Sequence, residues 1–250
     1  MTRMPRILVA TATYNERESL PYLFEAIQAS VPTVDILVVD DNSPDGTGQW
    51  VDEQAANDPR IRVIHRSGKL GLGTATIAAF QYAIDQDYEF LVALDADGSH
   101  DPARIPAMLE QAQTRTPSPD VVIGSRYVSG GGTEGWPLYR RWMSRAVNLY
   151  ARILLGLPCR DCSGSFRCMR VALLRDVDLT AVRSRGYSFF EEILWHFKKT
   201  GARFDEVPIT FRDRKYGASK INGREAITAL WLIFQLGIRN WLGLRPSTTP

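Results

Sequence analysis

Two aspartates that are two residues apart, Asp95 and Asp97, directly follow the apolar run 90–94 and are well placed to do chemistry. Side chains i and i+2 of a strand point to the same face. Two unpaired carboxylates held that close repel each other, which raises the pKa of one of them. Mg²⁺ relieves such repulsion and favours one or two carboxylates together with substrate phosphate oxygens. The pair therefore predicts a metal-assisted nucleotide-sugar site, although an Asp-x-Asp motif alone also fits a capped strand end.

The surrounding sequence predicts the elements that position this pair. Strand-like apolar runs alternate with helical stretches, which favours an α/β fold with parallel strands. We expect strands over 7–12, 34–39, 61–64, 90–94, 121–123 and 204–211, and helices that include 20–27, 74–86 and 138–155. Polar clusters follow three of these strands, and ligands of open α/β sheets bind at the carboxyl edge. Residues 129–135 form a glycine-rich loop, either a plain connection or a segment that closes on substrate.

Length and charge bound the function classes. A chain of 250 residues that is 44% hydrophobic can bury one substantial core, with an appendage at most. The net charge of +2 is nearly balanced and gives no reason to expect nucleic acid. Basic residues nevertheless cluster in 126–145 and 212–224, against only Glu134 and Asp213. These clusters are either solvated faces or recognition sites for an anionic substrate.

The cysteines and the N-terminus indicate where the protein works. An odd count of three cysteines argues against a disulfide framework. Cys159 and Cys162 have C-x-x-C spacing but lack a fourth ligand nearby, so we favour packed thiols over zinc. The run 7–10 is short and reads as a first strand rather than a signal peptide. We therefore expect the chain to remain in the cytoplasm.

The C-terminal run 226–238 is apolar almost all round, and Trp231 and Trp241 lie near the basic residues Arg224, Arg239 and Arg245. About 20 apolar residues are needed to cross a bilayer, and this run falls short. It is either a buried helix or an interfacial helix with basic flanks and tryptophan anchors. We favour contact with a membrane surface through residues 224–245.

An ordered set of motifs covers about residues 6–222. They lie at 12–16, 38–47, 70–74, 95–102, 124–127, 136–137, 140–141, 163–167 and 213–220. Together they resemble the dolichol-phosphate mannosyltransferases, also called polyprenol monophosphomannose synthases, of the family 2 glycosyltransferases. The resemblance implies a GT-A catalytic domain over 1–222, with a mixed, mostly parallel sheet flanked by helices. Residues 223–250 would then form a membrane-surface helix and tail.

The resemblance also implies roles for individual residues. The nucleotide pocket would include Ala12, Tyr14, Glu16, Val39 and Asp41. Asp95, Ala96 and Asp97 would frame the pyrophosphate and an Mg²⁺ or Mn²⁺ ion, with Ser99 standing where some relatives carry a glutamine ligand. Arg126, Arg140 and Ser144 would receive the acceptor phosphate, and Arg214 and Lys220 the donor phosphates. Asp95, Asp97, Arg126 and Arg140 would be the catalytic set.

The reaction that this family implies moves mannose from GDP-mannose to a polyprenyl phosphate with inversion. A phosphate monoester has a second pKa near 6, so the acceptor is already a dianion at neutral pH. It needs positioning and in-line approach rather than a general base. Glu191 and Glu192 resemble the acidic bases of other family 2 enzymes, but this mechanism gives them little to do. His65, His100 and His196 are isolated, and we expect structural roles for them.

The sequence leaves open two rival interpretations of the function and the question of whether an anchor subunit binds the tail. The donor is alternatively UDP-glucose or UDP-N-acetylglucosamine, although relatives of that kind usually carry two transmembrane helices. The chain is alternatively a non-catalytic nucleotide-sugar-binding subunit that recruits a partner to the membrane, which the intact acidic and basic motifs disfavour. A small hydrophobic anchor subunit for the tail is compatible with either.

Overall fold

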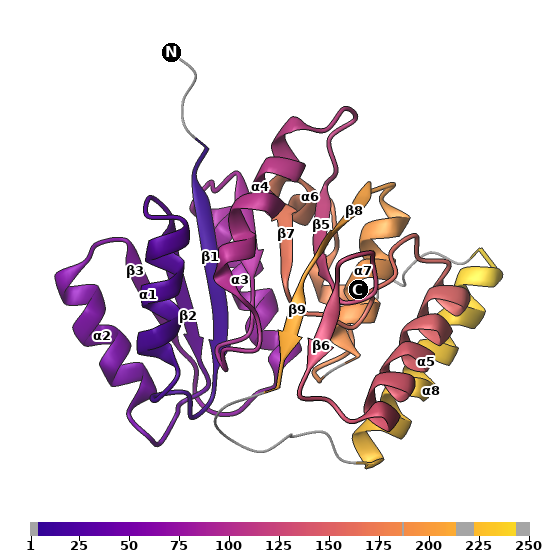
Figure 1. Cartoon of the computed structure of the whole chain (residues 1–250), viewed down its shortest axis with the longest axis horizontal. Coiled ribbons are helices and arrows are strands. Elements are labelled where there is room, and N and C mark those ends of the chain that lie inside the picture. The colour runs from indigo at the N-terminus through magenta and orange to yellow at the C-terminus, as the bar shows by residue number, and fades with distance from the viewer. Residues whose placement is uncertain (1–4, 187, 214–222, 244–250) are drawn as a thin grey trace.

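A computed structural model describes residues 5–186, 188–213 and 223–243 of the chain. Its centre is a seven-stranded sheet in the order β3-β2-β1-β4-β7-β5-β8 (Figure 1). The strands are β1 (Ile7–Thr13), β2 (Asp35–Asp40), β3 (Ile61–His65), β4 (Phe90–Ala93), β5 (Val121–Ser125), β7 (Arg167–Arg170) and β8 (Phe204–Pro208). β7 pairs antiparallel with β4 and β5, and the other pairings of this sheet are parallel. The mixed, mostly parallel sheet expected from the sequence is confirmed.

Helices cover both faces of this sheet, because each face presents apolar side chains. One core contains residues of α1 (Leu20–Ser30), α2 (Thr47–Asn57) and α4 (Ile105–Thr114), the last preceded by a 3₁₀ turn at Pro102–Arg104. The other core contains residues of α3 (Leu72–Asp85), α5 (Leu138–Leu155), α6 (Val171–Arg175), α7 (Phe189–Lys199) and α8 (Gly223–Trp241). A second 3₁₀ turn spans Leu179–Ala181. The sheet is therefore packed between two layers of helices.

The expected strand over 204–211 is wrong as a single element, because it divides at Pro208 and Ile209. β8 ends at Pro208, whose ring nitrogen has no hydrogen to donate to the sheet. Ile209 donates its own N–H to the carbonyl of Ser125 at 3.0 Å and buries its side chain. The chain then continues as β9 (Thr210–Arg212), which pairs in parallel with β6 (Gly132–Glu134). The glycine-rich loop therefore contains a short strand that fixes it to the segment after β8.

The C-terminal helix α8 packs along α5. Ile233 and Leu236 are buried in the same core as α5 and α7. Asn240 donates to the carbonyl of Leu154 at 3.2 Å and accepts a hydrogen bond from the indole of Trp195 at 3.2 Å. These contacts join α8 to α5 and α7. Of the two residues at the boundary expected at 222/223, residue 222 lies outside the described ranges. None of the helices over the described residues is long and apolar enough to cross a membrane.

Candidate active site

The carboxyl ends of β1, β2, β4 and β5 meet at one edge of the sheet. β4 and β5 run in the same direction because both are antiparallel to β7. The segments that follow these strands therefore start at a common edge, at the bottom of Figure 1. They carry Tyr14, Asp41, Asp97 and Arg126. The sequence prediction that the polar clusters after β1, β2 and β4 gather at the carboxyl edge is confirmed, and the segment after β5 joins them there.

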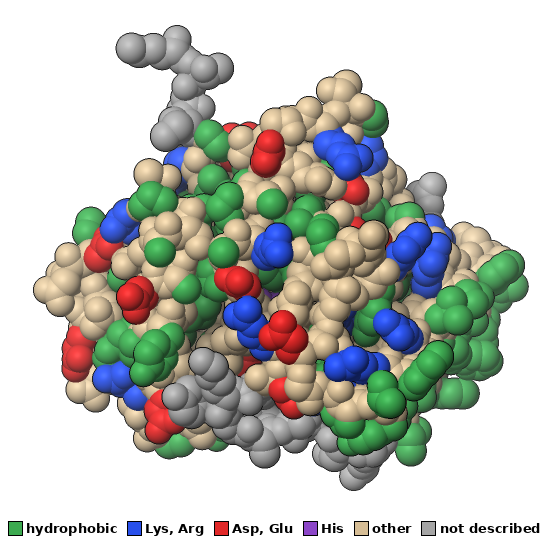
Figure 2. Space-filling model, in the orientation of Figure 1, with side chains coloured by type: hydrophobic (Ala, Val, Ile, Leu, Met, Phe, Trp, Pro, Cys, Tyr) green, Lys and Arg blue, Asp and Glu red, His purple; other side chains and the backbone are tan. Residues whose placement is uncertain are grey.

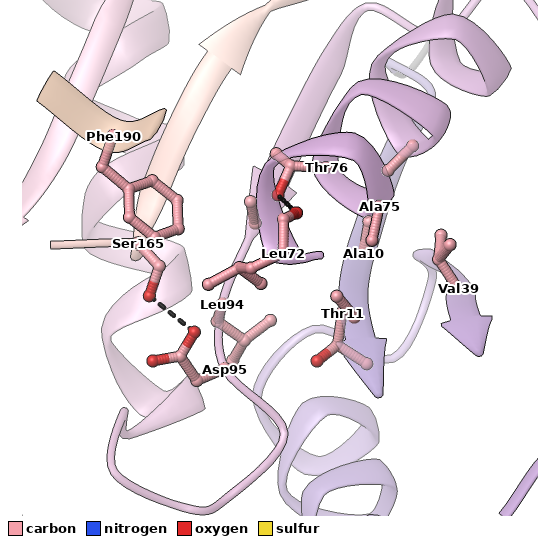
Figure 3. Close-up of a pocket in the computed structure, with 13 residues that line it drawn as sticks. Ala10, Thr11, Val39, Leu72, Ala75, Thr76, Leu94, Asp95, Ser165 and Phe190 are labelled. Atoms are coloured by element: carbon pink, nitrogen blue, oxygen red, sulfur yellow. Dashed lines mark hydrogen bonds between the residues drawn. The ribbon is translucent and has the colours of Figure 1, made fainter. Parts of the chain in front are cut away.

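The turn after β4 holds its two aspartates differently. Asp95 has a partly exposed carboxylate that accepts a 2.7 Å hydrogen bond from the hydroxyl of Ser165 (Figure 3). Asp97 is 7% exposed, and its Oδ1 accepts the backbone N–H of Ser99 at 3.0 Å. Ala96 between them is buried. The turn therefore presents two carboxylates of fixed geometry, with the second set deeper than the first.

The same turn fits a divalent cation. The hydroxyl of Ser99 is buried and has no hydrogen-bond partner among the described residues, so it is available as a neutral oxygen ligand. Over those residues, no group of three or more His, Cys, Asp or Glu side chains converges as a ligand set. A cation beside Asp97 would therefore take further oxygens from the substrate or water, as Mg²⁺ commonly does.

The residues expected to line the nucleotide pocket lie on β1 and β2 and in the segments that follow them. Ala12 and Val39 are neighbours in the parallel register and line one small pocket with Leu72 and Asp95 (Figure 3). Asp41 follows β2, and its carboxylate forms a 2.7 Å ion pair with Arg66.

Three further contacts order the segments that follow β1, β2 and β3. The Oδ2 atom of Asp41 accepts the backbone N–H of Leu70 at 3.1 Å, which fixes the loop after β3. The ammonium of Lys69 lies 4.5 Å from the centre of the Tyr14 ring, and Glu16 accepts a hydrogen bond from Ser19 at 3.0 Å. Arg66 and Lys69 were not predicted as site residues, because no motif in the sequence marks them.

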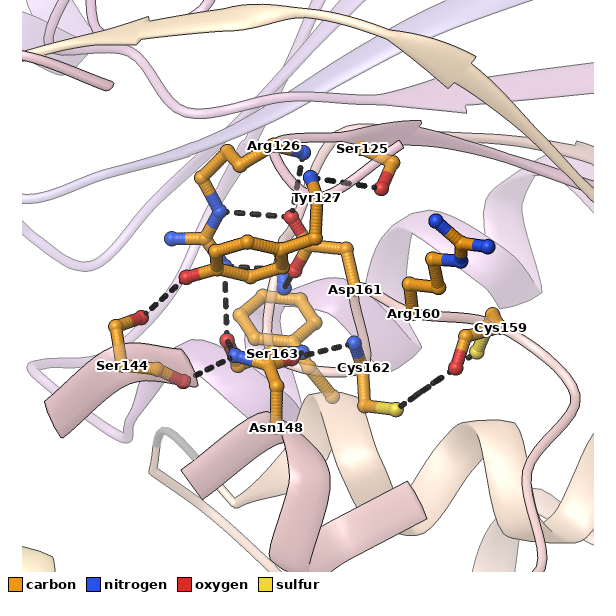
Figure 4. A network of polar contacts seen from close by, with 12 residues as sticks. Ser125, Arg126, Tyr127, Ser144, Asn148, Cys159, Arg160, Asp161, Cys162 and Ser163 are labelled. Carbon is orange, nitrogen blue, oxygen red and sulfur yellow. Dashed lines mark hydrogen bonds and ion pairs between the residues drawn. The ribbon is translucent and has the colours of Figure 1, made fainter. Parts of the chain in front are cut away.

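The three residues expected to receive the acceptor phosphate lie around Tyr127 and Trp136. The guanidinium carbon of Arg126 lies 5.7 Å, and that of Arg140 4.1 Å, from the centre of the Trp136 ring. Ser144 shares a 2.7 Å hydrogen bond with the hydroxyl of Tyr127 (Figure 4). The structure thus brings all three residues to one region.

Both arginines already have carboxylate partners. Arg126 is 8% exposed and forms a two-pronged ion pair with Asp161, with both contacts at 2.7 Å. Arg140 is paired with Asp213 at 3.0 Å. An acceptor phosphate would have to share Arg126 with Asp161 and compete with Asp213 for Arg140. Sequence analysis did not predict either ion pair, since the two partners of each pair are distant in the chain.

His100 connects the aspartate turn to the aromatic side chains that lie beside the arginines. Its ring lies 5.2 Å from that of Phe166 and 5.3 Å from that of Phe211, which in turn contacts Trp136 at 5.3 Å. Its Nδ1 accepts the backbone N–H of Asp95 at 3.2 Å. Burial lowers the pKa of His100 despite the nearby carboxylates, so the ring is neutral at pH 7. His100 therefore packs as a buried, neutral ring against these aromatic side chains. Arg214 and Lys220 lie outside the described residues.

The adjacent acids of α7 have different environments. Glu192 accepts the backbone N–H groups of Arg183 and Ser184 at 3.1 and 2.7 Å, so its carboxylate holds the preceding loop. Glu191 is 4% exposed, and its Oε2 has no hydrogen-bond partner among the described residues. Burial raises the pKa of Glu191 to about 7. Ionisation of the buried Glu191 therefore lowers the free energy of unfolding.

The raised pKa of Glu191 predicts how the stability of the protein depends on pH. The folded state holds the Glu191 proton up to about pH 7, whereas the unfolded chain releases it near 4.5. The stability that protonated Glu191 gives to the folded state is therefore complete below pH 4.5, and it is lost as the pH rises through 7. In Glu191→Gln this loss is absent, so the free energy of unfolding should shift in the variant's favour by about 3 kcal/mol between pH 4.5 and 8. Urea unfolding at several pH values measures the difference. Parallel pH profiles of variant and wild type would contradict it, and the exposed Glu89→Gln is the control.

Comparisons with known proteins identify the family. The family model for glycosyl transferase family 2 matches residues 8–178. The undecaprenyl-phosphate mannosyltransferase of Micrococcus luteus is 44% identical over 96% of this chain and 98% of its own length. The polyprenol monophosphomannose synthase of Mycolicibacterium smegmatis is 42% identical over 95% of this chain and 89% of its own.

Solved structures agree in fold. Glucosyl-3-phosphoglycerate synthase of Mycobacterium tuberculosis, in complex with Mn²⁺, UDP and glucosyl-3-phosphoglycerate, aligns with a TM-score of 0.64 at 17% identity. The match covers 98% of this chain and 82% of that one. The GT-A fold expected from the motifs is confirmed. With two thirds of its length matched by the family model and full-length relatives above 40% identity, the chain belongs to glycosyl transferase family 2 and is a glycosyltransferase.

Proposed function

We propose that the enzyme transfers mannose from GDP-mannose to a polyprenyl phosphate, with inversion at the anomeric carbon. The observation that carries the proposal is the juxtaposition of two opposite charge sets at one sheet edge. Asp95 and Asp97 lie in the turn that leads into His100, and the His100 ring contacts Phe211. Phe211 in turn packs against Arg126 and against Trp136, which lies beside Arg140. A carboxylate pair suits a cation with a diphosphate, and arginines suit a phosphate monoester. The names of the two relatives support mannose as the sugar and a polyprenyl phosphate as the acceptor.

The chain's own residues explain how transfer would proceed. The acceptor is already anionic at neutral pH and needs no proton removed. Arg126, Arg140 and Ser144 hold its phosphate and aim one oxygen at the anomeric carbon from the face opposite the nucleotide, which gives inversion in a single displacement. Asp97, with Ser99, would hold the Mg²⁺ or Mn²⁺ ion. When bound, that ion offsets the charge that develops on the departing diphosphate. Arg214 and Lys220 are proposed to hold the donor phosphates.

A two-helix apolar face supports binding at a membrane surface. Along α5, the exposed large side chains are Leu138, Tyr139, Trp142, Met143, Leu149 and Ile153. Along α8 and just after it, they are Ile227, Leu230, Trp231, Phe234, Ile238, Trp241 and Leu242. Figure 2 shows this apolar face along the right-hand edge, beside blue basic side chains. The α5 sequence has four arginines and no acid, which suits anionic lipid.

The apolar face also explains how a lipid-linked acceptor would reach the site. Arg140 and Ser144 belong to α5, the same helix that carries Trp142 and Met143. A lipid phosphate at the membrane surface would therefore lie beside the residues proposed to bind it. We propose a cytoplasmic enzyme bound peripherally to the membrane, with a small anchor subunit as an additional contact for α8.

A donor panel tests the proposed reaction. Purified enzyme with Mg²⁺ and a short polyprenyl phosphate should form lipid-linked sugar from GDP-mannose. We expect turnover with UDP-glucose or UDP-N-acetylglucosamine to be at least about 100-fold slower, because a site built around one base and sugar leaves polar groups unpaired with another. Faster turnover with a UDP-sugar would reassign the donor. Binding of nucleotide sugar without transfer to any polyprenyl phosphate would indicate a non-catalytic role.

A further inference from the structure

Asp161 makes an unusually complete set of contacts with Arg126. Its Oδ2 accepts Nε of Arg126 at 2.7 Å and the backbone N–H of the same residue at 2.9 Å, and its Oδ1 accepts Nη2 at 2.7 Å. The carboxylate is fully buried. These bonds fix both the backbone and the guanidinium plane of Arg126 (Figure 4). Nη1 is left without a hydrogen-bond partner among the described residues, on the edge of the guanidinium that Asp161 does not occupy.

The pair is ionic. Burial opposes charge on Asp161, but the charge and hydrogen bonds of Arg126 outweigh it and hold the pKa of Asp161 below its ordinary value. The same pairing raises the pKa of Arg126 against the effect of burial. A buried ion pair recovers its desolvation cost only with such geometry and with its remaining groups satisfied. The Arg126–Asp161 pair therefore holds the guanidinium in a fixed orientation beside the proposed acceptor site.

The loop that carries Asp161 is itself fastened to the other phosphate-binding element. Asn148 of α5 accepts the backbone N–H groups of Cys162 and Ser163 at 2.7 and 3.1 Å. Its amide donates to the carbonyl of Ser144 at 2.8 Å and to the hydroxyl of Ser163 at 3.0 Å. The Ser163 hydroxyl also accepts Nη2 of Arg126 at 2.8 Å. A continuous chain of hydrogen bonds thus joins Arg126 to the helix that carries Ser144.

We propose that Asp161 is a positioning residue for the acceptor phosphate. It holds Arg126 so that Nη1 donates to the phosphate, while Ser163 and Asn148 set the distance from Arg126 to Ser144. This inference rests on the proposed function, since it assumes a phosphorylated acceptor. A group held by packing and hydrogen bonds keeps the geometry that in-line transfer requires.

The test compares Asp161→Asn with the wild type for binding and for turnover. Farnesyl phosphate is the binding probe, followed by the fluorescence of Trp136 and the other tryptophans. We expect its Kd, and the KM for the polyprenyl phosphate, to rise at least tenfold in Asp161→Asn, with the KM for GDP-mannose unchanged. Asp120→Asn is the matched control, because Asp120 receives Nε, Nη2 and the backbone N–H of Arg203 in the same pattern before β5 begins. That control should leave both constants within twofold.

A double-variant comparison separates positioning from a general structural role. In an Arg126→Gln background, Asp161→Asn should add no further loss of acceptor affinity, because Asp161 acts through Arg126. Unchanged acceptor constants in Asp161→Asn, or an equal further loss in the Arg126→Gln background, would overturn the inference. If Asp161→Asn does not fold, Ser163→Ala replaces it with the same expected direction, and unchanged acceptor constants there would equally overturn the inference. Failure of the wild type to bind farnesyl phosphate would refute the proposed acceptor and this inference together. Binding by the wild type with no loss in the variant would refute this inference alone.

Discussion

The Asp97→Ala variant should lose at least about 10³-fold in the rate of transfer while its fold and melting temperature stay near those of the wild type. Asp97 is the deeper of the two carboxylates after β4, and it is proposed to anchor the cation that offsets charge on the departing diphosphate. The carboxylate that remains, Asp95, is partly exposed and already hydrogen-bonded to Ser165. Asp95 alone is therefore a poorer cation site than Asp97. Transfer of labelled mannose from GDP-mannose at saturating Mg²⁺ measures the loss.

Two further measurements make this result specific. Asp52→Asn removes an exposed carboxylate of α2 that pairs with His65 at 3.1 Å, and it should leave the rate unchanged. Raising the Mn²⁺ concentration should restore part of the activity of Asp97→Asn, whose amide oxygen is a weaker ligand, but none of that of Asp97→Ala. Full activity in Asp97→Ala would show that the cation, if one is used, binds elsewhere.

The paired substitution Trp142→Glu and Trp231→Glu should release the enzyme from anionic lipid vesicles. Trp142 of α5 is 69% exposed and Trp231 of α8 is 58% exposed, so both are open to solvent in the folded chain. Burying one large apolar side chain is worth about 1.5–3 kcal/mol, so losing two should weaken binding by about 100-fold or more. Sedimentation with vesicles that contain phosphatidylglycerol measures the bound fraction.

The control places the same change outside the two-helix apolar face. Tyr22→Glu alters a side chain of α1 that is 67% exposed, and sedimentation should be unchanged. With a short, water-soluble isoprenyl phosphate, the paired tryptophan variant should keep the wild-type rate. Unchanged sedimentation of that variant would show that this face serves another contact, such as an anchor subunit or a second copy of the chain.

Much of the fold follows from local pattern. Buried parallel strands read as continuous apolar runs, so β1, β2 and β4 were predicted to within one residue at each end. The helix over 138–155 was predicted with its observed ends, because Pro137 precedes it and Gly156, at φ 61°, ends it. β7 was missed because its first residue, Arg167, is a buried arginine that reads as a surface residue. Its guanidinium is satisfied by the carbonyls of Cys162 and Phe190, which no local pattern reveals.

The residues of the site likewise divide into those that local motifs predict and those that depend on contacts between distant parts of the chain. Asp95, Asp97, Arg126, Arg140 and Ser144 belong to motifs that the sequence displays, and the structure gathers them at one edge. Asp161 does not stand out, because its meaning depends on Arg126, which lies 35 residues earlier in the chain. The cysteines on either side of it drew attention instead, and both are buried thiols. Residues such as Asp161 can therefore be recognised only from contacts in the folded structure.

A crystal of the enzyme soaked with GDP and Mn²⁺ tests the central claim most directly. We expect an anomalous Mn²⁺ peak in contact with the carboxylate of Asp97 and with diphosphate oxygens, at about 2.0–2.2 Å, and guanine near Asp41. Bound GDP whose diphosphate lies away from the turn at 95–97, with no metal peak there, would contradict the claim that this sheet edge neutralises the leaving group.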